Sequence, residues 1–274
     1  MAQIEPGTGN IGAGVELSLQ DKCALITGGS RGIGAATLRL FRRAGARVAF
    51  SYRAAAQQAE TLATECGGAG VCHAIQQDLL TPADGEALIA ASVAALGRLD
   101  CLVINHGIWP SHDAPIGSMA DEQWRETLGT NLDSVFGLLR AGVAQMQRQP
   151  VHAEGTRGKI VLVSSTAGQR GEAFHTDYAA SKGALISMTK GLSTELAAQG
   201  IAVNCVAPGW VHTDMSAETL ADPLASKKIG STIPLGRVGT PDEIAGPILF
   251  LCTPWAGFVQ GEIFNVNGGA VLVG

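Results

Sequence analysis

Long apolar runs and an excess of positive charge are both missing from this sequence. No stretch approaches the roughly 18 consecutive apolar residues that a membrane span requires, so we expect no contact with the membrane interior. Lysine and arginine number 19 against 24 aspartate and glutamate, for a net charge of −5. An acidic chain of this kind is not a general binder of nucleic acid or of anionic membrane surfaces, and we expect neither as a partner.

Paired cysteines and a leader sequence are missing as well. The first 20 residues hold no basic region followed by an apolar stretch, so we expect no secretory signal there and interpret residues 1–20 as a flexible tail. The six cysteines show no Cys-x-x-Cys spacing and predict reduced core thiols in a cytoplasmic protein, with no metal site. They stand at positions 23, 66, 72, 101, 205 and 252.

What the sequence has is a regular alternation of apolar runs and helical stretches. Its 274 residues, 46% of them apolar, suffice for one large domain over residues 21–274. The apolar runs are continuous, as in parallel strands covered on both faces. We therefore predict an α/β fold with one doubly wound, Rossmann-type parallel sheet and helices on both faces. The seven predicted strands span 22–27, 46–51, 71–76, 100–104, 159–164, 201–206 and 262–266.

Some connections have signals of their own. Helix starts are expected at Thr81-Pro82 and at Thr240-Pro241-Asp242-Glu243, where the second combines an N-cap, a first-position proline and a capping-box glutamate. The least regular stretch is 208–234, which we interpret as a candidate mobile lid.

A glycine-rich turn follows the first predicted strand. It runs from Thr27 to Gly34 with the spacing Gly-x-x-x-Gly-x-Gly, between the apolar residues 23–26 and a helical stretch. Glycines allow a tight turn and a close approach of the backbone to a pyrophosphate, and the start of the helix offers free N–H groups. The spacing differs from Gly-x-Gly-x-x-Gly, but the strand–turn–helix context favours dinucleotide binding.

Tyr178 is one of only two tyrosines, and Lys182 follows it by four residues. On a helix both side chains would project from one face. An unperturbed tyrosine has a pKa of about 10, and a nearby cation lowers it, so the phenol could exchange a proton with a carbonyl oxygen. Alone the spacing also fits an ordinary surface pair. Beside the glycine turn it predicts hydride transfer between a nicotinamide and a carbonyl or alcohol.

Together these motifs resemble the short-chain dehydrogenase/reductase family, over roughly residues 21–272. Further segments carry the resemblance: Ile104-Asn105-His106-Gly107 after the fourth strand, Asn131 in Gly129-Thr130-Asn131-Leu132, Ser165 in Val163-Ser164-Ser165-Thr166-Ala167-Gly168, Pro208-Gly209 with Thr213, and Val266-Asn267-Gly268-Gly269.

The resemblance implies a role for each catalytic residue. Ser165 would hydrogen-bond the substrate oxygen, and Tyr178 would exchange the proton. Lys182 would hold the nicotinamide ribose and lower the pKa of the tyrosine, while Asn131 would anchor a water that links the lysine to solvent. The implied cofactor contacts are Gly28, Ser30, Arg31, Gly32, Ile33, Gly34, Tyr52, Arg53, Asp78, Leu79, Asn105, Gly107, Tyr178, Lys182, Pro208, Gly209, Val211 and Thr213.

Departures from the family pattern occur after the fourth strand, where Ile104 and His106 replace an asparagine and an alanine. We interpret His106 as a packed or hydrogen-bonded residue and do not assign it to catalysis. Ser164 is a rival for Ser165, whose distance along the chain from Tyr178 fits the family better.

The end of the second strand bears on cofactor choice. An acid usually stands there to bind the ribose 2′-hydroxyl of NAD, but this chain has Tyr52-Arg53. Arg53, with Arg31 from the glycine turn, suits a 2′-phosphate. We therefore favour NADP(H), with NAD(H) left open.

The segments 210–215 and 234–237 resemble bacterial 3-oxoacyl-(acyl-carrier-protein) reductases, which implies a 3-oxoacyl thioester carried on acyl carrier protein or CoA. The arginines that dock the carrier in those enzymes correspond here to Thr156 and Gln199, with Arg157 as a neighbour that could compensate. A sugar, polyol or other secondary-alcohol dehydrogenase is the alternative. Candidate pocket residues, which core packing explains equally well, are Trp109, Trp210, Met215 and Leu220.

Two further expectations follow from the resemblance. A nucleotide sensor without turnover would tend to lose the tyrosine or the lysine, which this chain retains. A homotetramer or homodimer is expected, with helices around 131–148 and 175–198 at an interface. The stripe on the first helix would serve there or face the core, and consists of Leu138, Leu139, Val143 and Met146.

Overall fold

The computed structural model describes residues 15–273, and its centre is one sheet of seven parallel strands in the order β3-β2-β1-β4-β5-β6-β7. The predicted fold is confirmed, and each predicted strand is present to within two residues at either end. The strands span β1 Cys23–Ile26, β2 Arg47–Tyr52, β3 Cys72–Gln76, β4 Cys101–Ile104, β5 Gly158–Val163, β6 Ile201–Pro208 and β7 Ile263–Val266.

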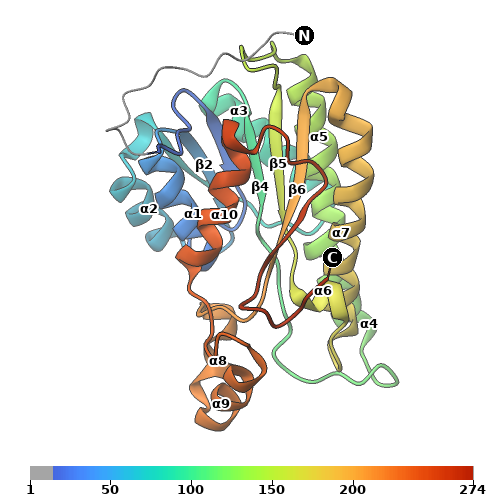
Figure 1. Cartoon of the computed structure of the whole chain (residues 1–274). Coiled ribbons are helices and arrows are strands. Elements are labelled where there is room, and N and C mark those ends of the chain that lie inside the picture. Colours follow the sequence, from blue (N-terminus) through green and yellow to red (C-terminus); the bar gives the residue numbers. More distant parts are fainter. Residues whose placement is uncertain (1–14, 274) are drawn as a thin grey trace.

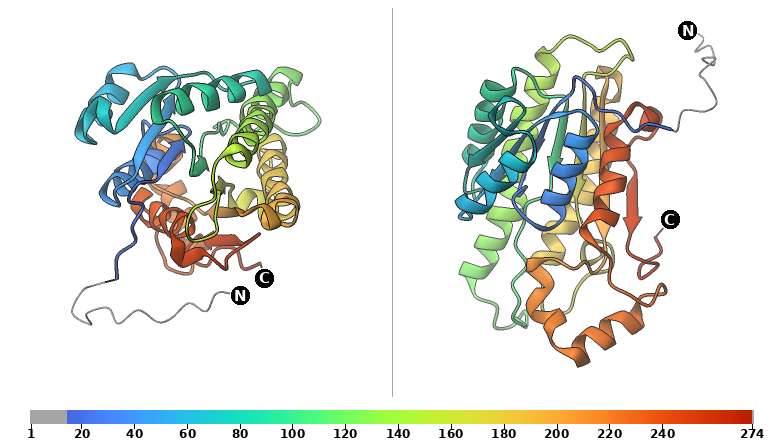
Figure 2. Two further views of the ribbon diagram at one scale, coloured as in Figure 1. Left: turned by 90° about the horizontal axis from the view of Figure 1, so that it is seen from above. Right: turned by 90° about the vertical axis from the view of Figure 1, so that its left-hand side faces the viewer.

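Helices cover both faces of this sheet, as Figures 1 and 2 show. One layer consists of α1 (Gly32–Arg43), α2 (Ala56–Glu65) and α10 (Pro241–Cys252); the other consists of α3 (Pro82–Leu96), α5 (Ser134–Arg148) and α7 (Thr176–Leu196). Successive strand residues point to opposite faces, so Ile26 packs in the first layer and Leu25 in the second. Among the described residues, no helix is long and apolar enough to cross a membrane.

Strand order reverses between β1 and β4, because the chain first builds outward to β3 and then crosses to the other side of β1. The connections that follow these two neighbouring strands diverge, and ligands of open α/β sheets bind in the crevice at such a point. The glycine turn follows β1, and the segment 105–109 follows β4.

Both predicted helix starts are confirmed. At α3 the Thr81 hydroxyl accepts from the Asp84 N–H at 3.4 Å, and the Asp84 carboxylate accepts from the Thr81 N–H at 2.7 Å. Thr240 and Glu243 make the same reciprocal pair at α10, at 3.4 and 2.9 Å. Each pair satisfies N–H groups that the first turn of a helix leaves free.

The segment 208–234 is more regular than its sequence predicted. It holds two helices, α8 (Asp214–Ala221) and α9 (Pro223–Thr232), which extend beyond the rest of the molecule in Figure 1. Short capping signals explain them: Ser216 closes a reciprocal cap with Thr213, and the Asp222 carboxylate accepts from the Leu224 N–H at 3.0 Å. The mobility of this candidate lid stays a prediction.

Packed structure begins before the expected domain boundary at residue 21. Leu19 is buried in the core and its N–H donates to the Ala44 carbonyl at 2.7 Å. Residues 1–14 of the predicted tail lie outside the described residues.

Candidate active site

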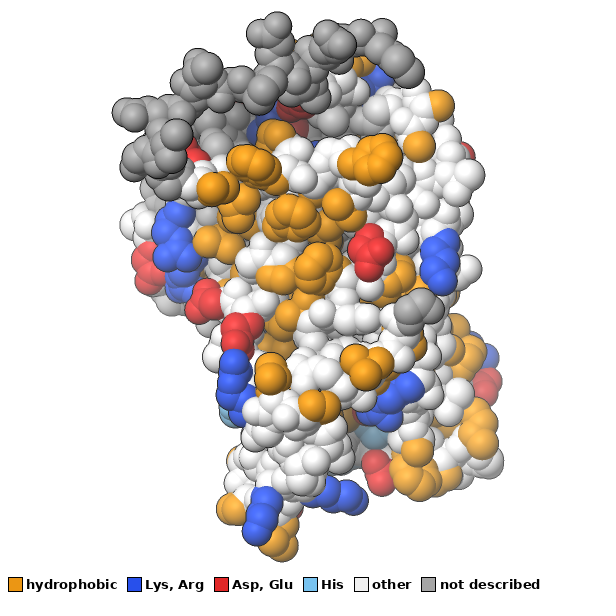
Figure 3. Space-filling view, viewed as in Figure 1, with side chains coloured by type: hydrophobic (Ala, Val, Ile, Leu, Met, Phe, Trp, Pro, Cys, Tyr) orange, Lys and Arg blue, Asp and Glu red, His pale blue; other side chains and the backbone are white. Residues whose placement is uncertain are grey.

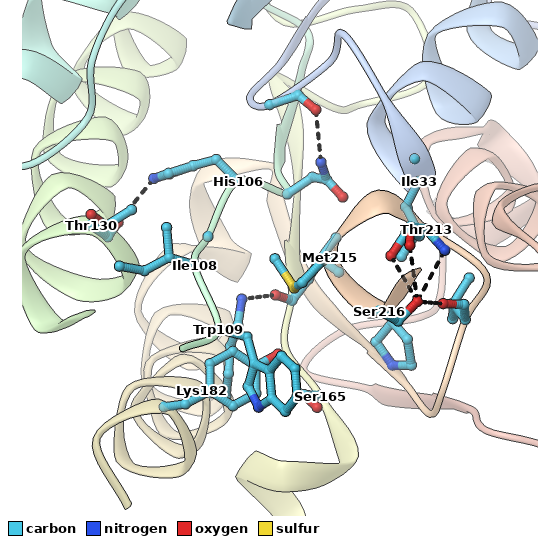
Figure 4. A pocket seen from close by; sticks show the side chains of 18 of the residues that line it. Ile33, His106, Ile108, Trp109, Thr130, Ser165, Lys182, Thr213, Met215 and Ser216 are labelled. Carbon is cyan, nitrogen blue, oxygen red and sulfur yellow. Dashed lines mark hydrogen bonds between the residues drawn. The ribbon is translucent and has the colours of Figure 1, made fainter. Parts of the chain in front are cut away.

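The predicted site residues meet at the carboxyl edge of the sheet, around a cavity of about 340 Å³. Figure 4 shows Ile33 and Thr213 on one side of it and Trp109, Ser165 and Lys182 on another. Two predicted residues, Gly34 and Asn131, do not line the cavity. All the others do: Gly28, Ser30, Arg31, Gly32, Ile33, Tyr52, Arg53, Asp78, Leu79, Asn105, Gly107, Ser165, Tyr178, Lys182, Pro208, Gly209, Val211 and Thr213.

The glycine turn is held in place by Asn105, whose side-chain amide donates to the carbonyls of Thr27 at 3.0 Å and Gly28 at 3.2 Å. Gly28 has a φ of +62°, a conformation that favours glycine. A Cβ on Gly34 would lie 2.1 Å from the Gly28 carbonyl oxygen, so Gly34 shapes the turn from behind without lining the cavity.

Helix α1 starts directly at this turn, with Gly32 as its first residue. Its first N–H groups have no partner within the helix and carry the positive end of the helix dipole. Ser30, Gly32 and Ile33 line the cavity here. The turn and the start of the helix therefore fit the pyrophosphate of a dinucleotide.

Asn131 lies on a π-helical turn, Gly129–Asp133, between α4 (Asp121–Leu128) and α5. Its amide donates to the Ile108 carbonyl at 2.9 Å, and its Oδ1 accepts from the Ile108 N–H at 2.8 Å. A Cβ on Gly107 would lie 3.1 Å from Asn131 Oδ1 and 3.2 Å from Lys182 Nζ. The asparagine thus fixes the segment after β4 beside the lysine, while its water-anchoring role stays a prediction.

Tyr178 and Lys182 both stand in the first part of α7, on the face that lines the cavity. Lys182 Nζ lies 5.8 Å from the centre of the Tyr178 ring and donates to the Val163 carbonyl at 3.0 Å. Burial raises the pKa of Tyr178 to about 12, while the nearby Ser165 hydroxyl opposes that rise. Burial also lowers the pKa of Lys182 to about 8.

The expectation that Lys182 lowers the pKa of Tyr178 stays a prediction. In this structure burial is the largest influence on the pKa of each group, because removal from water disfavours the charged form of each. Tyr178 therefore carries its proton near neutral pH, as a proton donor to a carbonyl oxygen must.

The two rival serines have different partners. The Ser164 hydroxyl donates to the Lys182 carbonyl at 2.8 Å, within the core. Ser165 begins the short helix α6 (Thr166–Arg170), and its hydroxyl oxygen accepts from the Ala167 N–H at 3.1 Å. That contact leaves the Ser165 hydrogen to donate towards the Tyr178 phenol or a substrate oxygen in the cavity, so the geometry supports Ser165 as the substrate-binding serine.

His106 is hydrogen-bonded at both ring nitrogens. Thr27 Oγ1 already accepts from two backbone N–H groups, so its own hydrogen goes to His106 Nδ1 at 2.7 Å. Nε2 then carries the ring hydrogen and faces the Thr130 carbonyl at 3.1 Å and the Ser134 hydroxyl at 2.9 Å. Burial, and then the charge of Lys182, lower the pKa of His106 to about 3, so the ring is a neutral structural group.

At the β2 end of the cavity stand Arg31, Tyr52 and Arg53. Both guanidinium groups are exposed, and Arg31 has only a long contact of 3.5 Å with the Asp214 carboxylate on α8. No carboxylate follows β2 directly. Two positive charges therefore lie where the sequence predicts that the adenosine ribose binds.

Several cavity residues escaped the sequence analysis, among them the charged residues Arg170 and Glu172. Arg170 ends α6 and Glu172 lies in the connection to α7, a few residues before Tyr178. Their charges in a neutral stretch between the serine and the tyrosine were the signal that could have found them. Of the candidate pocket residues, Trp109, Trp210 and Met215 line the cavity, and Leu220 lines a separate hollow between α8 and α9.

Comparisons of sequence and of structure find similar proteins over nearly the whole chain. A family model described as enoyl-(acyl carrier protein) reductase matches residues 28–271. L-rhamnose 1-dehydrogenase (NAD(P)(+)) of Azotobacter vinelandii is 37% identical over 92% of this chain and 97% of its own. A 3-oxoacyl-[acyl-carrier-protein] reductase of Vibrio cholerae is 35% identical over 94% of this chain and 100% of its own. The crystal structure of a blue fluorescent protein from a metagenomic library, in complex with NADPH, superposes with a TM-score of 0.83 at 35% identity, over 93% of this chain and 100% of that one.

Proposed function

The chain belongs to the short-chain dehydrogenase/reductase family, and we propose that it is an NADP(H)-dependent oxidoreductase that interconverts a carbonyl and a secondary alcohol. One observation carries the proposal. Ser165, Tyr178 and Lys182 line the same cavity as the glycine turn, so a proton donor and a dinucleotide cradle open onto one space.

Each catalytic group has a task in this proposal. The nicotinamide supplies or takes the hydride when it is bound. The Ser165 hydroxyl donates a hydrogen bond to the substrate oxygen, and the protonated phenol of Tyr178 gives its proton to that oxygen as the carbonyl is reduced. Lys182, with a pKa of about 8, replaces the proton through its ammonium group. Asn131 keeps the segment after β4 in position beside the lysine.

Two arginines support NADP(H) over NAD(H). Arg31 and Arg53 line the cavity at the end of β2 with exposed guanidinium groups, and the one ion pair that Arg31 makes, with Asp214, is long at 3.5 Å, so both can form charge-assisted bonds with a 2′-phosphate. A similar protein of known structure binds NADPH. NAD(H) is the weaker candidate because no acid follows β2.

A 3-oxoacyl thioester is the first substrate candidate, since reductases of acyl carrier protein thioesters match nearly the whole chain. The carrier would be acyl carrier protein or CoA. One structural observation favours the second candidate, a sugar or polyol. Arg157, the residue that could compensate for lost carrier-docking arginines, turns its guanidinium onto the Gln147 and Gln149 carbonyls.

A kinetic panel tests the proposal. NADPH and NADH are each combined with acetoacetyl-CoA, and NADP⁺ and NAD⁺ with simple sugars and polyols. Turnover of at least one carbonyl or alcohol, faster with the phosphorylated cofactor, is the expected result. Complete inactivity towards both substrate classes, with NADPH binding intact, would favour a non-catalytic nucleotide sensor.

We also propose a homo-oligomer, a tetramer or a dimer. Of the stripe named above, Leu138, Leu139 and Met146 are buried in the core and Val143 is partly buried against it, so we do not assign the contact to that stripe. A better surface lies around the free edge of the sheet at β7, where Trp255 and Phe258 are exposed and hydrophobic side chains gather over the visible face (Figure 3). A monomer in light scattering at micromolar concentration would contradict this.

The six cysteines support a cytoplasmic location. All six are buried and unpaired, which suits a compartment that keeps thiols reduced.

A further inference from the structure

One wall of the cavity contains polar and aromatic groups that the proposed hydride and proton transfers do not use. Arg170 and Glu172 line it beside Ser165 and Tyr178. Trp109 lines the same wall, on the side of Lys182 and Ser165 in Figure 4. This set, which we call the polar wall, adjoins the place where the substrate oxygen must lie.

The backbone that carries Glu172 is held in an unusual conformation. Gly171 has a φ of +79°, and Phe174 has a φ of +65°, which is uncommon for a bulky residue. The turn is fixed by the His175 N–H, 3.3 Å from the Glu172 carbonyl, and by the Ala114 N–H, 3.0 Å from the Phe174 carbonyl. Strain of this kind persists only where surrounding contacts impose it, and it gathers at functional sites.

Trp109 is fixed from two sides. The His175 ring lies 4.8 Å from it at an interplanar angle of 32°, and Trp210 meets it edge-on at 5.9 Å and 83°. His175 is 5% exposed, and neither of its ring nitrogens has a partner among the described residues. An indole packed in this way offers a flat apolar surface with a polar edge.

Glu172 is the group on this wall with hydrogen-bonding capacity to spare. Burial raises the pKa of its carboxyl, while His175, Arg170 and Trp109 lower it by smaller amounts. Among the described residues, no ion pair within 4.0 Å joins Glu172 to Arg170. A carboxylate has about four acceptor positions, so beyond the contact with the Trp109 indole Glu172 can still accept hydrogen bonds from a ligand in the cavity.

We propose that the polar wall is a recognition site for a polyhydroxylated substrate, in which Glu172 accepts hydrogen bonds from hydroxyl groups next to the reacting carbon. This inference rests on the proposed oxidoreductase function and names its substrate class. Trp109 packs against the C–H face of the same molecule, and Arg170 donates to a further oxygen at the mouth.

An acyl chain suits this wall poorly. Its carbons next to the reacting carbonyl offer no O–H or N–H donor, so Glu172 would lose water without gaining a partner. Sites built to hydrogen-bond a substrate hydroxyl reject analogues that lack it strongly, because the buried polar group is left unpaired. The wall therefore discriminates between the two substrate candidates in favour of a sugar, polyol or aldonate.

The test compares Glu172→Gln with wild type on two substrate classes. The first class is L-rhamnose, D-glucose, ribitol and D-gluconate with NADP⁺, and the second is acetoacetyl-CoA with NADPH. Glu218→Gln on α8 is the matched control, since that carboxylate is exposed and does not line the cavity. Binding is followed separately by tryptophan fluorescence in the Tyr178→Phe background with NADP⁺ present.

We expect wild type to oxidise at least one of the polyhydroxylated compounds. Glu172→Gln should lower kcat/KM for it by roughly 10- to 100-fold, the range for one charge-assisted hydrogen bond, and weaken its binding equally. Glu218→Gln should match wild type. Reduction of acetoacetyl-CoA without turnover of any polyhydroxylated compound would overturn the inference and leave the proposed function standing. Equal losses on both substrate classes would also overturn it. Inactivity towards every substrate would instead count against the proposed function.

Discussion

The two ends of the cavity are built from different parts of the chain. At the nucleotide end, backbone forms the part of the surface that fits a pyrophosphate: a glycine turn fixed by Asn105 and the first N–H groups of α1, with the Arg31 and Arg53 side chains at the β2 end. At the substrate end, side chains from α6, α7 and the segment after β4 form the surface, and the backbone beneath them is irregular at Phe174 and at the π-turn around Asn131.

The difference reflects what each end binds. A pyrophosphate is common to all dinucleotides, and a short backbone motif suffices to hold it. A reacting carbon needs several side chains placed accurately relative to one another. Strained or irregular backbone at the substrate end supplies that placement. Substitutions at the nucleotide end should therefore weaken cofactor binding, and substitutions at the substrate end should lower turnover.

Tyr178→Phe should give the largest effect and the cleanest separation of the two ends. The change removes the proton donor but keeps the ring, so turnover should fall by roughly 10²–10⁴ while NADPH affinity stays nearly constant. Steady-state rates and NADPH fluorescence titration measure the two quantities. A kcat close to that of wild type would remove the proposed mechanism.

Lys182→Met should separate function from stability. Burial lowers the pKa of Lys182 from 10.5 to about 8. Below pH 8 the charged Lys182 therefore lowers the free energy of unfolding by about 3 kcal/mol. The variant should lose turnover and yet resist urea better than wild type at pH 7.

The sign of that effect with pH follows from linkage. Between about pH 8 and 10.5 the unfolded chain binds more protons at Lys182 than the folded one, so wild-type stability rises with pH and the advantage of Lys182→Met shrinks. Urea unfolding at pH 7 and pH 9.5 measures this. A variant less stable than wild type at pH 7 would contradict it.

Gly34→Ala should damage the nucleotide end alone. Its Cβ would lie 2.1 Å from the Gly28 carbonyl oxygen, so the turn must move, at a cost in stability of about 1–3 kcal/mol, and NADPH affinity should fall. Gly246→Ala in α10 is the control, because its Cβ would meet nothing within 4 Å. Unchanged NADPH affinity in Gly34→Ala would show that the turn adapts.

Arg53→Ala should give the smallest effect and sharpen cofactor choice. Loss of one charge-assisted contact with the 2′-phosphate should lower kcat/KM for NADPH by about tenfold and leave that for NADH almost unchanged. Arg43→Ala, an exposed arginine at the end of α1, should affect neither. Equal losses with both cofactors, or a wild type that prefers NADH, would refute the assignment to NADP(H).

The sequence predicts the nucleotide end of the cavity better than the substrate end. The seven strands and the glycine turn are encoded by contiguous residues, and those predictions hold. The sequence shows Glu172 only as a charge between the serine and the tyrosine, because its place in the cavity next to Trp109 and His175 depends on tertiary structure. The raised pKa of Tyr178 was also out of reach, since spacing shows that Lys182 is near but not how completely both groups are removed from water.

The π-turn at Gly129–Asp133 has a consequence for anyone who aligns or redesigns this stretch. Such a turn holds one residue more than an α-helical turn. A register counted continuously from Asp121 to Arg148 therefore assigns every position after the turn to a face about 100° from its true direction. Deleting a single residue here would turn Asn131 away from Ile108, although the segment would remain helical. An aligned asparagine is thus meaningful only when the extra residue is present too.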